Sequence, residues 1–487
     1  MWLNLYTTRL TLTNLGVEDM GVYGVVGSIV SLFSVFTSGL TYAVQRFITF
    51  EIGLKSGNPN KVFCSSLNVI FILSAVMVIL IETGGSWMLE NKVNIPDGSR
   101  IASFWVFQLS VLTCIVNMIS IPYNALIIAH EKINFFATIS IIQVVLNFLS
   151  AFCLGIFINN RLLIYAILLA AVSIFIRLLY QLYCHKKFAE ATYHLIIDWK
   201  MIRQIGKFTG VVSTSGIMGV IASQGTVFII NITFGVAINA VYNIALQLKN
   251  SVLSFSLNIL KAISPQITKN YASNELDIYK KLVIGGSKLE VFLIYIIMMP
   301  FLFRTNYIME LWLGNVPEYT VIFVQCTVLL SLTYAAFDPI RIGVLATNNI
   351  TKFMLIPDAI YMLVLPLGYI IGDFTDSPSC FIKSVVAFEI IVCGIRILYA
   401  SKATIFRKKE LVTNILLPCL FVAITDGAVC GMLSYTLPES LFGLIALVFV
   451  NCVCLIILVF LCGLSKIERN QMKQVYLKFR NSKKSVR

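Results

Sequence analysis

The chain has 487 residues, of which 58% are hydrophobic and only 12% are charged. A typical soluble domain is about 25% charged, so this composition excludes a soluble multidomain enzyme and a disordered chain, and it predicts an integral membrane protein. The formal net charge of +14 is attributed to basic cytoplasmic loops, and no nucleic-acid partner is expected.

Apolar segments long enough to cross a hydrocarbon layer of about 30 Å recur along the whole chain. They predict an all-α membrane protein with thirteen to fourteen transmembrane helices. Residues 1–15 are interpreted as the end of a first, partial span rather than as a signal peptide. Thirteen full-length spans are predicted after it, at 21–45, 62–82, 103–127, 134–158, 162–183, 208–232, 238–260, 285–303, 320–337, 353–372, 381–400, 411–434 and 440–463.

The placement of charge predicts the orientation of these spans. When residues 51–61 face the cytoplasm, most of the 37 basic residues fall in loops on that side or in the tail. This interpretation assigns Lys288, Arg341 and Arg396 to cytoplasmic loops and makes the C-terminus cytoplasmic. The loops are too short to hold a soluble catalytic domain.

A weak internal repeat predicts the domain organisation. A shift of 219 residues places Leu15–Val17 on Phe234–Val236, and Gly21–Tyr23 on Ala240–Tyr242. The repeat predicts two six-helix lobes in a pseudo-twofold arrangement with a cleft between them. The predicted boundaries are 1–184 for the first lobe with its partial first helix, 185–207 for a basic cytoplasmic linker, 208–402 for the second lobe, 403–464 for an extra helix pair and 465–487 for a basic amphipathic tail.

Two basic residues in or beside predicted spans are candidates for substrate binding, because charge inside a membrane is costly and usually functional. Arg46 is either an anchor at the cytoplasmic interface or a cation at the inner end of a cavity. Lys249 lies beside amide side chains that face either a cavity or a neighbouring helix. The further cavity candidates are Gln45, Gln224, Asn231, Asn243, Gln247, Asn250 and, less strongly, Arg9.

Acidic residues and known sequence motifs give little further indication of ion coupling or catalysis. Asp338 and Asp426 are candidate carriers of a coupling ion, although a local salt bridge to Arg341 explains Asp338 as well. The 12 cysteines and three histidines show no metal-ligand spacing, and no P-loop, GxSxG or HExxH motif occurs. We therefore expect no enzyme, no catalytic residue, no cofactor and no metal.

Four segments carry a family resemblance: LYTTRLTLTNLGVEDMGVYGVVGSIVSLFS at 5–34, AVQRFITFEIG at 43–53, IPYNALIIAHEKINFFA at 121–137 and PEYTVIF at 317–323. Together they resemble the polysaccharide-transporter branch of the multidrug/oligosaccharidyl-lipid/polysaccharide (MOP) flippase superfamily, to which MATE exporters also belong. The nearest resemblance is to the O-antigen and capsule repeat-unit flippases of Bacteroides-type bacteria.

The resemblance implies a multi-pass protein of the bacterial inner membrane that works by alternating access. Its implied substrate is a polyprenyl-diphosphate-linked oligosaccharide for O-antigen lipopolysaccharide, capsule or exopolysaccharide, moved from the cytoplasmic to the periplasmic leaflet. Arg46 and Lys249 match the cations that hold the diphosphate. Membrane lipids and other polysaccharide-assembly proteins are the further partners. In similar proteins the first helix begins about one span before Met1, so a start codon upstream or a truncation is expected.

Two alternatives remain open from the sequence. An ion-coupled MATE-type exporter of cationic drugs needs acidic residues in its first-lobe cavity. Glu18, Asp19 and Glu51 instead fall in loops or at span ends, and the charges expected to be buried, Arg46 and Lys249, are basic. A membrane-embedded glycan polymerase or ligase typically carries a large external loop, and none is predicted.

Overall fold

The computed structural model describes residues 34–87, 100–157, 160–194, 198–347 and 349–464, together with residue 469 and scattered residues before residue 34. Every regular element in these ranges is helical, and ten of the described helices are long and apolar enough to cross a membrane. The predicted all-α membrane fold is therefore confirmed. The remaining predicted spans correspond to α2, to the second part of α8 and to α14.

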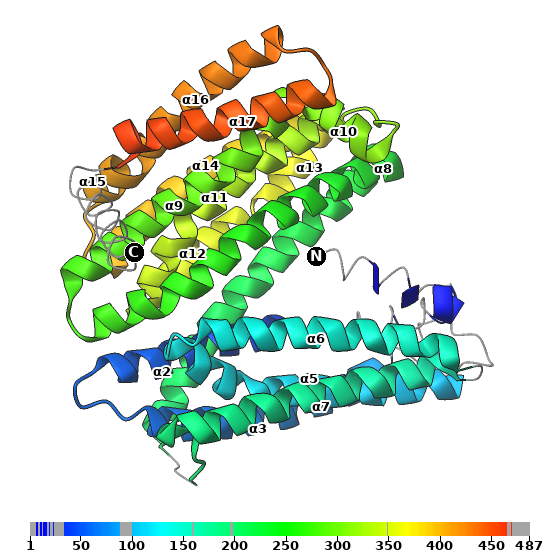
Figure 1. Cartoon of the computed structure of the whole chain (residues 1–487), viewed down its shortest axis with the longest axis vertical. Coiled ribbons are helices and arrows are strands. Elements are labelled where there is room, and N and C mark those ends of the chain that lie inside the picture. Colours follow the sequence, from blue (N-terminus) through cyan, green and yellow to red (C-terminus); the bar gives the residue numbers. More distant parts are fainter. Residues whose placement is uncertain are drawn as a thin grey trace, which may run out of the picture. The chain divides into compact units, whose positions relative to one another are not determined.

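The described chain forms two compact units. Unit 1 comprises Met1–Ile217 with Tyr271–Asn274, and unit 2 comprises Met218–Asn270 with Glu275–Arg487. Unit 1 contains α2 (Ser34–Gly53), α3 (Pro59–Leu80), η1 (Ile81–Gly85), α5 (Arg100–Ala129), α6 (Ile133–Cys153), η3 (Leu154–Ile156), α7 (Arg161–Lys187), η4 (Ala189–Ala191) and the beginning of α8 (Trp199–Ala272). In Figure 1, α5, α6 and α7 lie side by side, and α5 packs most extensively against α7 and α2.

Unit 2 holds the rest of α8 and all later elements. These are α9 (Leu276–Phe303), α10 (Thr305–Leu313), α11 (Thr320–Ala346), α12 (Thr351–Tyr361), α13 (Val364–Thr375), α14 (Pro378–Ala403), α15 (Lys408–Leu411), η5 (Val412–Leu416), α16 (Leu417–Thr436), α17 (Leu441–Leu458) and η6 (Val459–Gly463). The span predicted at 353–372 corresponds to Thr351–Thr375, within which a short turn at Met362 and Leu363 separates α12 from α13. Pro366 has no N–H to donate to the carbonyl of Met362, so it cannot continue the α12 ladder.

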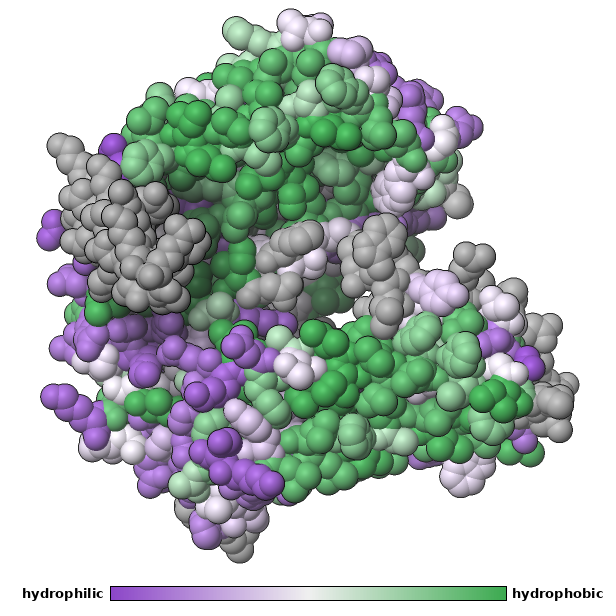
Figure 2. Space-filling model, viewed as in Figure 1, coloured by the Kyte–Doolittle hydropathy of each residue, from purple (hydrophilic) through white to green (hydrophobic). Residues whose placement is uncertain are grey.

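The outer faces of the helices are apolar, as a lipid environment requires. On α17 the exposed residues Phe442, Ile445, Phe449 and Ile456 recur every three, four or seven residues, so they form one stripe. Figure 2 shows extended hydrophobic areas along the helix flanks, and in unit 1 the hydrophilic residues gather at one end. Several hydroxyls donate to carbonyls of their own helices, as in the bond from Ser120 Oγ to Val116 O at 2.8 Å.

Residues of the predicted basic linker dock onto other parts of unit 1. The side chain of Asn60 donates to the carbonyl oxygens of Glu190 and Thr192 at 2.8 and 2.7 Å. His130 Nε2 lies 2.5 Å from Glu190 Oε1. The ammonium group of Lys61, 2.5 Å from Asp198, holds the pKa of Asp198 below its ordinary value. These contacts fix the connection between α7 and α8.

The last helix pair is held to α9 by polar contacts. Tyr295 on α9 donates to the carbonyl of Cys419 at 2.9 Å, and Asn451 on α17 donates to the carbonyl of Ile296 at 3.1 Å. At the end of α9, the buried Arg304 donates to the carbonyls of Ser434 and Leu437, in the last turn of α16 and directly after it. The hairpin of α16 and α17 is therefore an integral part of unit 2.

Two glycines matched by the internal repeat share an uncommon backbone conformation. Gly16 has φ +81° and Gly235 has φ +83°. Gly235, with ψ −179°, separates the two helical parts that make up α8. Residues with a Cβ rarely adopt backbone conformations with φ near +80°. The repeat therefore matches two positions at which the backbone conformation favours glycine.

Gly235→Ala is expected to destabilise unit 2 by about 1–3 kcal/mol, because alanine would be strained at this φ and ψ. The measurement is the midpoint of thermal unfolding of purified protein in detergent. Gly219→Ala is the matched control, since Gly219 lies within the helical part of α8 with open space around its missing Cβ. It should leave the midpoint unchanged or raise it, because alanine favours helix. Equal loss in both variants would contradict the assignment of strain to Gly235.

Candidate functional site

Arg46 lies on α2 inside unit 1, with 6% of its surface exposed. Its guanidinium carbon lies 4.5 Å from the ring centroid of Phe47, 4.8 Å from that of Phe50 and 5.7 Å from that of Phe208 on α8. Arg46 also interacts electrostatically with Glu51 and Tyr271. Cation–π contact of this kind offsets part of the cost of removing the charge from water. The neighbouring Gln45 is half-buried.

The charge of Arg46 stands out in unit 1. Among the described residues of unit 1 that are buried, it is the only one with a formal charge, and the other buried polar residues are serines and threonines. No buried carboxylate therefore accompanies it in the described part of this unit. Such a site attracts an anion and repels a cation.

Lys249 lies in unit 2, on the part of α8 that follows Gly235. Its ammonium nitrogen lies 4.9 Å from the ring centroid of Tyr334 on α11, and it interacts electrostatically with Glu389. The amide side chains predicted beside it, Asn243, Gln247 and Asn250, are exposed. Lys249 is half-buried against α11, so it does not share the orientation of those amides.

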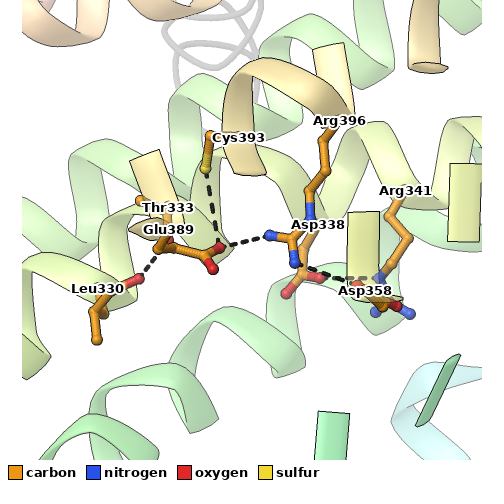
Figure 3. Close-up of polar contacts among 8 residues, drawn as sticks. All are labelled: Leu330, Thr333, Asp338, Arg341, Asp358, Glu389, Cys393 and Arg396. Carbon is orange, nitrogen blue, oxygen red and sulfur yellow. Dashed lines mark hydrogen bonds and ion pairs between the residues drawn. The ribbon is translucent and has the colours of Figure 1, made fainter. Parts of the chain in front are cut away.

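A buried ion-pair network occupies the interior of unit 2 (Figure 3). Arg396 Nη1 on α14 lies 2.7 Å from Oε1 of Glu389. Glu389 is on the same helix, two turns before Arg396. Nη2 of Arg396 lies 3.4 Å from Asp358 Oδ1 on α12. The side chain of Glu389 is 0% exposed, and its other oxygen has no hydrogen-bond partner within the described residues. The network joins α12 and α14 and gives Lys249 an anionic neighbour.

A second charged group lies on α11 and α9. Arg341 Nε is 3.1 Å from Asp338 Oδ1, so the local salt bridge suggested by their spacing is confirmed. Glu290 on α9 is fully buried and accepts a hydrogen bond from Ser256 on α8. The charges of Asp338 and Arg341 both act on Glu290. The role of Asp338 in ion coupling stays a prediction.

Asp426 lies on α16 and is 0% exposed. Neither carboxylate oxygen has a hydrogen-bond partner among the residues that the structure describes. An unpaired buried carboxylate is costly, and such groups are functional candidates in membrane helices. Asp426 therefore remains a candidate for carrying a coupling proton or ion.

The remaining candidates are scattered. On α8, Gln224 is exposed and Asn231 is half-buried, and both belong to unit 2. Asn243 donates to the carbonyl of Asn239 at 2.9 Å within its own helix. Arg9 lies outside the described residues. Within the described residues, no group of three or more His, Cys, Asp or Glu side chains could hold a metal ion.

Comparison with known proteins gives a fold but no family. No protein-family model matches the sequence, and no curated protein matches it. Solved structures match over most of the chain. A crystal structure of a MATE mutant has a TM-score of 0.71 at 13% identity, covering 84% of this chain and 93% of its own. The MATE transporter VcmN of Vibrio cholerae, in a bent form, has a TM-score of 0.65 at 15% identity, with 84% and 96% covered.

The chain has the MATE fold. A MOP superfamily transporter from Pyrococcus furiosus shares it, with a TM-score of 0.64 at 13% identity, covering 84% of this chain and 93% of its own.

Three of the basic residues predicted to lie in cytoplasmic loops lie within helices of the MATE fold. Lys288, Arg341 and Arg396 were assigned to cytoplasmic loops, but they lie inside α9, α11 and α14. Lys288 and Arg396 already fall within the spans predicted at 285–303 and 381–400, whereas Arg341 lies within α11 because that helix ends at Ala346 rather than at 337. Arg341 and Arg396 are paired with carboxylates, and paired charges are tolerated in helices that pack against other protein. One signal could have revealed the pair of Glu389 and Arg396, since a separation of seven residues places both on one helix face.

Proposed function

We propose that this protein is a membrane transporter that moves an anionic, lipid-linked glycan across the membrane by alternating access. The substrate class is a polyprenyl-diphosphate-linked oligosaccharide repeat unit, carried from the cytoplasmic to the periplasmic leaflet. The observation that carries the proposal is Arg46, the sole formal charge among the buried described residues of unit 1. A diphosphate needs such a cation, because unpaired phosphate charge is strongly excluded from hydrocarbon.

The charges in unit 2 are compatible with the same substrate. Two of its buried carboxylates, Glu389 and Glu290, are engaged with Arg396 and Ser256 inside the protein, and Asp426 remains a candidate for ion coupling. Lys249 adds a second cation in or beside a predicted span. The MOP superfamily transporter from Pyrococcus furiosus is described as having a binding pocket of reverse polarity, which suggests a different function for that protein. Proteins that share this fold can therefore differ in the polarity of their binding pocket.

The MATE fold fits an exporter of cationic drugs equally well, so the experiment must separate the two substrates. The gene is deleted in its host, and polyprenyl-diphosphate glycans are extracted and tested for the leaflet that they face. Accumulation of cytoplasm-facing repeat units with loss of surface polysaccharide is the expected result. Unchanged lipid-linked glycans, together with raised sensitivity to cationic drugs, would favour the exporter and overturn the proposal.

A further inference from the structure

A cavity of about 650 Å³, lined by both polar and apolar groups, lies inside unit 1. Its walls come from α2, α5, α6 and α7, and its volume falls in the range of about 300–1,000 Å³ that is typical of small-molecule sites. Arg46 is not among the residues that line it. The cavity is therefore a feature separate from the cation already described.

One face of α5 supplies most of the polar groups. Ser110, Thr113, Asn117, Ser120 and Asn124 all line the cavity, and their alternating spacing of three and four residues places them on one stripe over four turns. The hydroxyl groups of Ser110, Thr113 and Ser120 each donate a hydrogen bond to a carbonyl of their own helix at 2.8 Å. Their oxygens keep lone pairs that can accept a hydrogen bond from a ligand.

Amide groups add both donors and acceptors. Gln143 and Asn147 on α6 line the cavity one turn apart, and Asn117 and Asn124 on α5 line it two turns apart. The side-chain oxygen of Asn124 is buried and has no hydrogen-bond partner within the described residues. A buried acceptor left without a partner is costly, so the site is suited to a ligand or water that donates to it.

Aromatic rings complete the wall. Tyr23, Phe136 on α6 and Tyr180 on α7 line the cavity, and the rings of Phe136 and Tyr180 are stacked with centroids 6.4 Å apart. The flat faces of such rings pack against the C–H faces of sugar rings. Hydroxyl, amide and aromatic groups together match a ligand that is rich in hydroxyls but also has apolar faces.

The described lining residues carry no formal charge. A neutral wall compensates poorly for the loss of water around an ion, whereas it can exchange hydrogen bonds with a neutral polar ligand at little net cost. This property separates the cavity from Arg46, which is suited to an anion. The two features correspond to the two chemical parts of a glycosyl diphosphate.

We propose that this cavity binds uncharged sugar residues of the transported glycan. The proposal rests on the proposed function and deepens it, because it assigns a separate subsite to the oligosaccharide. Asn117, Asn124, Gln143 and Asn147 are the hydrogen-bonding groups, and Phe136 and Tyr180 are the stacking surfaces.

Cys114 provides a native reporter, since it lines the cavity and is half-buried. The full chain is purified in lipid nanodiscs and treated with N-ethylmaleimide, and alkylation of each cysteine is followed by mass spectrometry. The probe is the oligosaccharide freed from the host's lipid-linked repeat unit by mild acid. At ten times its dissociation constant it should slow alkylation of Cys114 about tenfold. The exposed Cys462 in unit 2 should react unchanged.

Variants test whether the cavity wall is responsible. Gln143→Leu and Asn147→Leu keep similar side-chain sizes and should abolish protection of Cys114, whereas Arg46→Gln should preserve it. Alkylation of Cys114 without probe reports whether each variant keeps its fold. Loss of the same protection in Arg46→Gln would overturn the separate subsite.

Further arms separate this proposal from the proposed function. Maltotriose serves as a second neutral probe, and inorganic pyrophosphate, sodium chloride and tetraphenylphosphonium serve as charged ones. If gene deletion leaves the lipid-linked glycans unchanged but a neutral saccharide protects Cys114, sugar binding stands and the flippase function fails. If flipping is established but neither saccharide protects Cys114 from alkylation, the sugar subsite is wrong. The same conclusion follows if only sodium or tetraphenylphosphonium protects Cys114.

Discussion

Replacing Arg396 by leucine is expected to destabilise unit 2 by about 3–5 kcal/mol, the usual loss when one partner of a buried ion pair is removed. The physical reason is Glu389, whose side chain is 0% exposed and whose Oε1 lies 2.7 Å from the guanidinium. Its other oxygen already lacks a hydrogen-bond partner within the described residues. The measurement is denaturant or thermal unfolding of the purified protein in detergent.

The double variant Glu389→Leu with Arg396→Leu should recover part of that loss, because it no longer leaves the fully buried Glu389 carboxylate without its cation. Recovery is not complete, since Asp358 and Lys249 each lose one charged neighbour. The matched control is Lys280→Leu, which breaks the ion pair with Glu410 at 3.2 Å, where both side chains are about one-third exposed. A partly exposed pair of this kind contributes up to about 1 kcal/mol. Equal destabilisation by Arg396→Leu and Lys280→Leu would contradict the buried network.

Arg46→Gln is expected to lower transport of the lipid-linked glycan by about ten- to a hundredfold. A hydrogen bond to a charged group contributes about 1.5–3 kcal/mol, and each 1.4 kcal/mol is a factor of ten. Arg46→Lys should retain part of the activity, because it keeps the charge but loses the planar, bidentate donor geometry. The measurement is the fraction of repeat units facing the periplasm, at matched amounts of protein in the membrane.

Arg203→Gln is the control for Arg46, since Arg203 is an exposed basic residue on α8 in the same unit. It should leave transport unchanged. The thermal midpoint of each variant is also measured, because cation–π contacts with Phe47, Phe50 and Phe208 contribute to stability. A stable Arg46→Gln protein with normal transport would show that Arg46 serves the packing of α2 rather than the substrate.

Local sequence signals predicted the positions of the helices well. The span predicted at 162–183 corresponds to α7 at Arg161–Lys187, and the break between 232 and 238 corresponds to Gly235. These features depend on the hydropathy of one segment or on the backbone freedom of one residue, so they can be read without knowing any neighbour. The short turn between α12 and α13, within the span predicted at 353–372, was not predicted, although Pro366 follows it in the first turn of α13.

The pairing of polar groups could not be predicted in the same way. Arg396 was counted with the cytoplasmic basic residues although it falls within the span predicted at 381–400, and the sequence did not show that Glu389 and Asp358 compensate its charge inside unit 2. The spacing of Ser110 and Asn117 on α5 shows one polar stripe, but only the packing of α6 and α7 makes it the wall of a cavity.

The sequence by itself determined that this is a helical membrane protein, where most of its helices lie and where the chain turns between them. The tertiary structure decided which buried charges are paired, that Arg46 lies among aromatic rings, and that the amides of α5 and α6 face one another across a cavity. The reason is physical. Hydropathy sums over residues that are adjacent in the chain, whereas the compensation of a charge or an amide depends on groups that only folding brings within hydrogen-bonding distance.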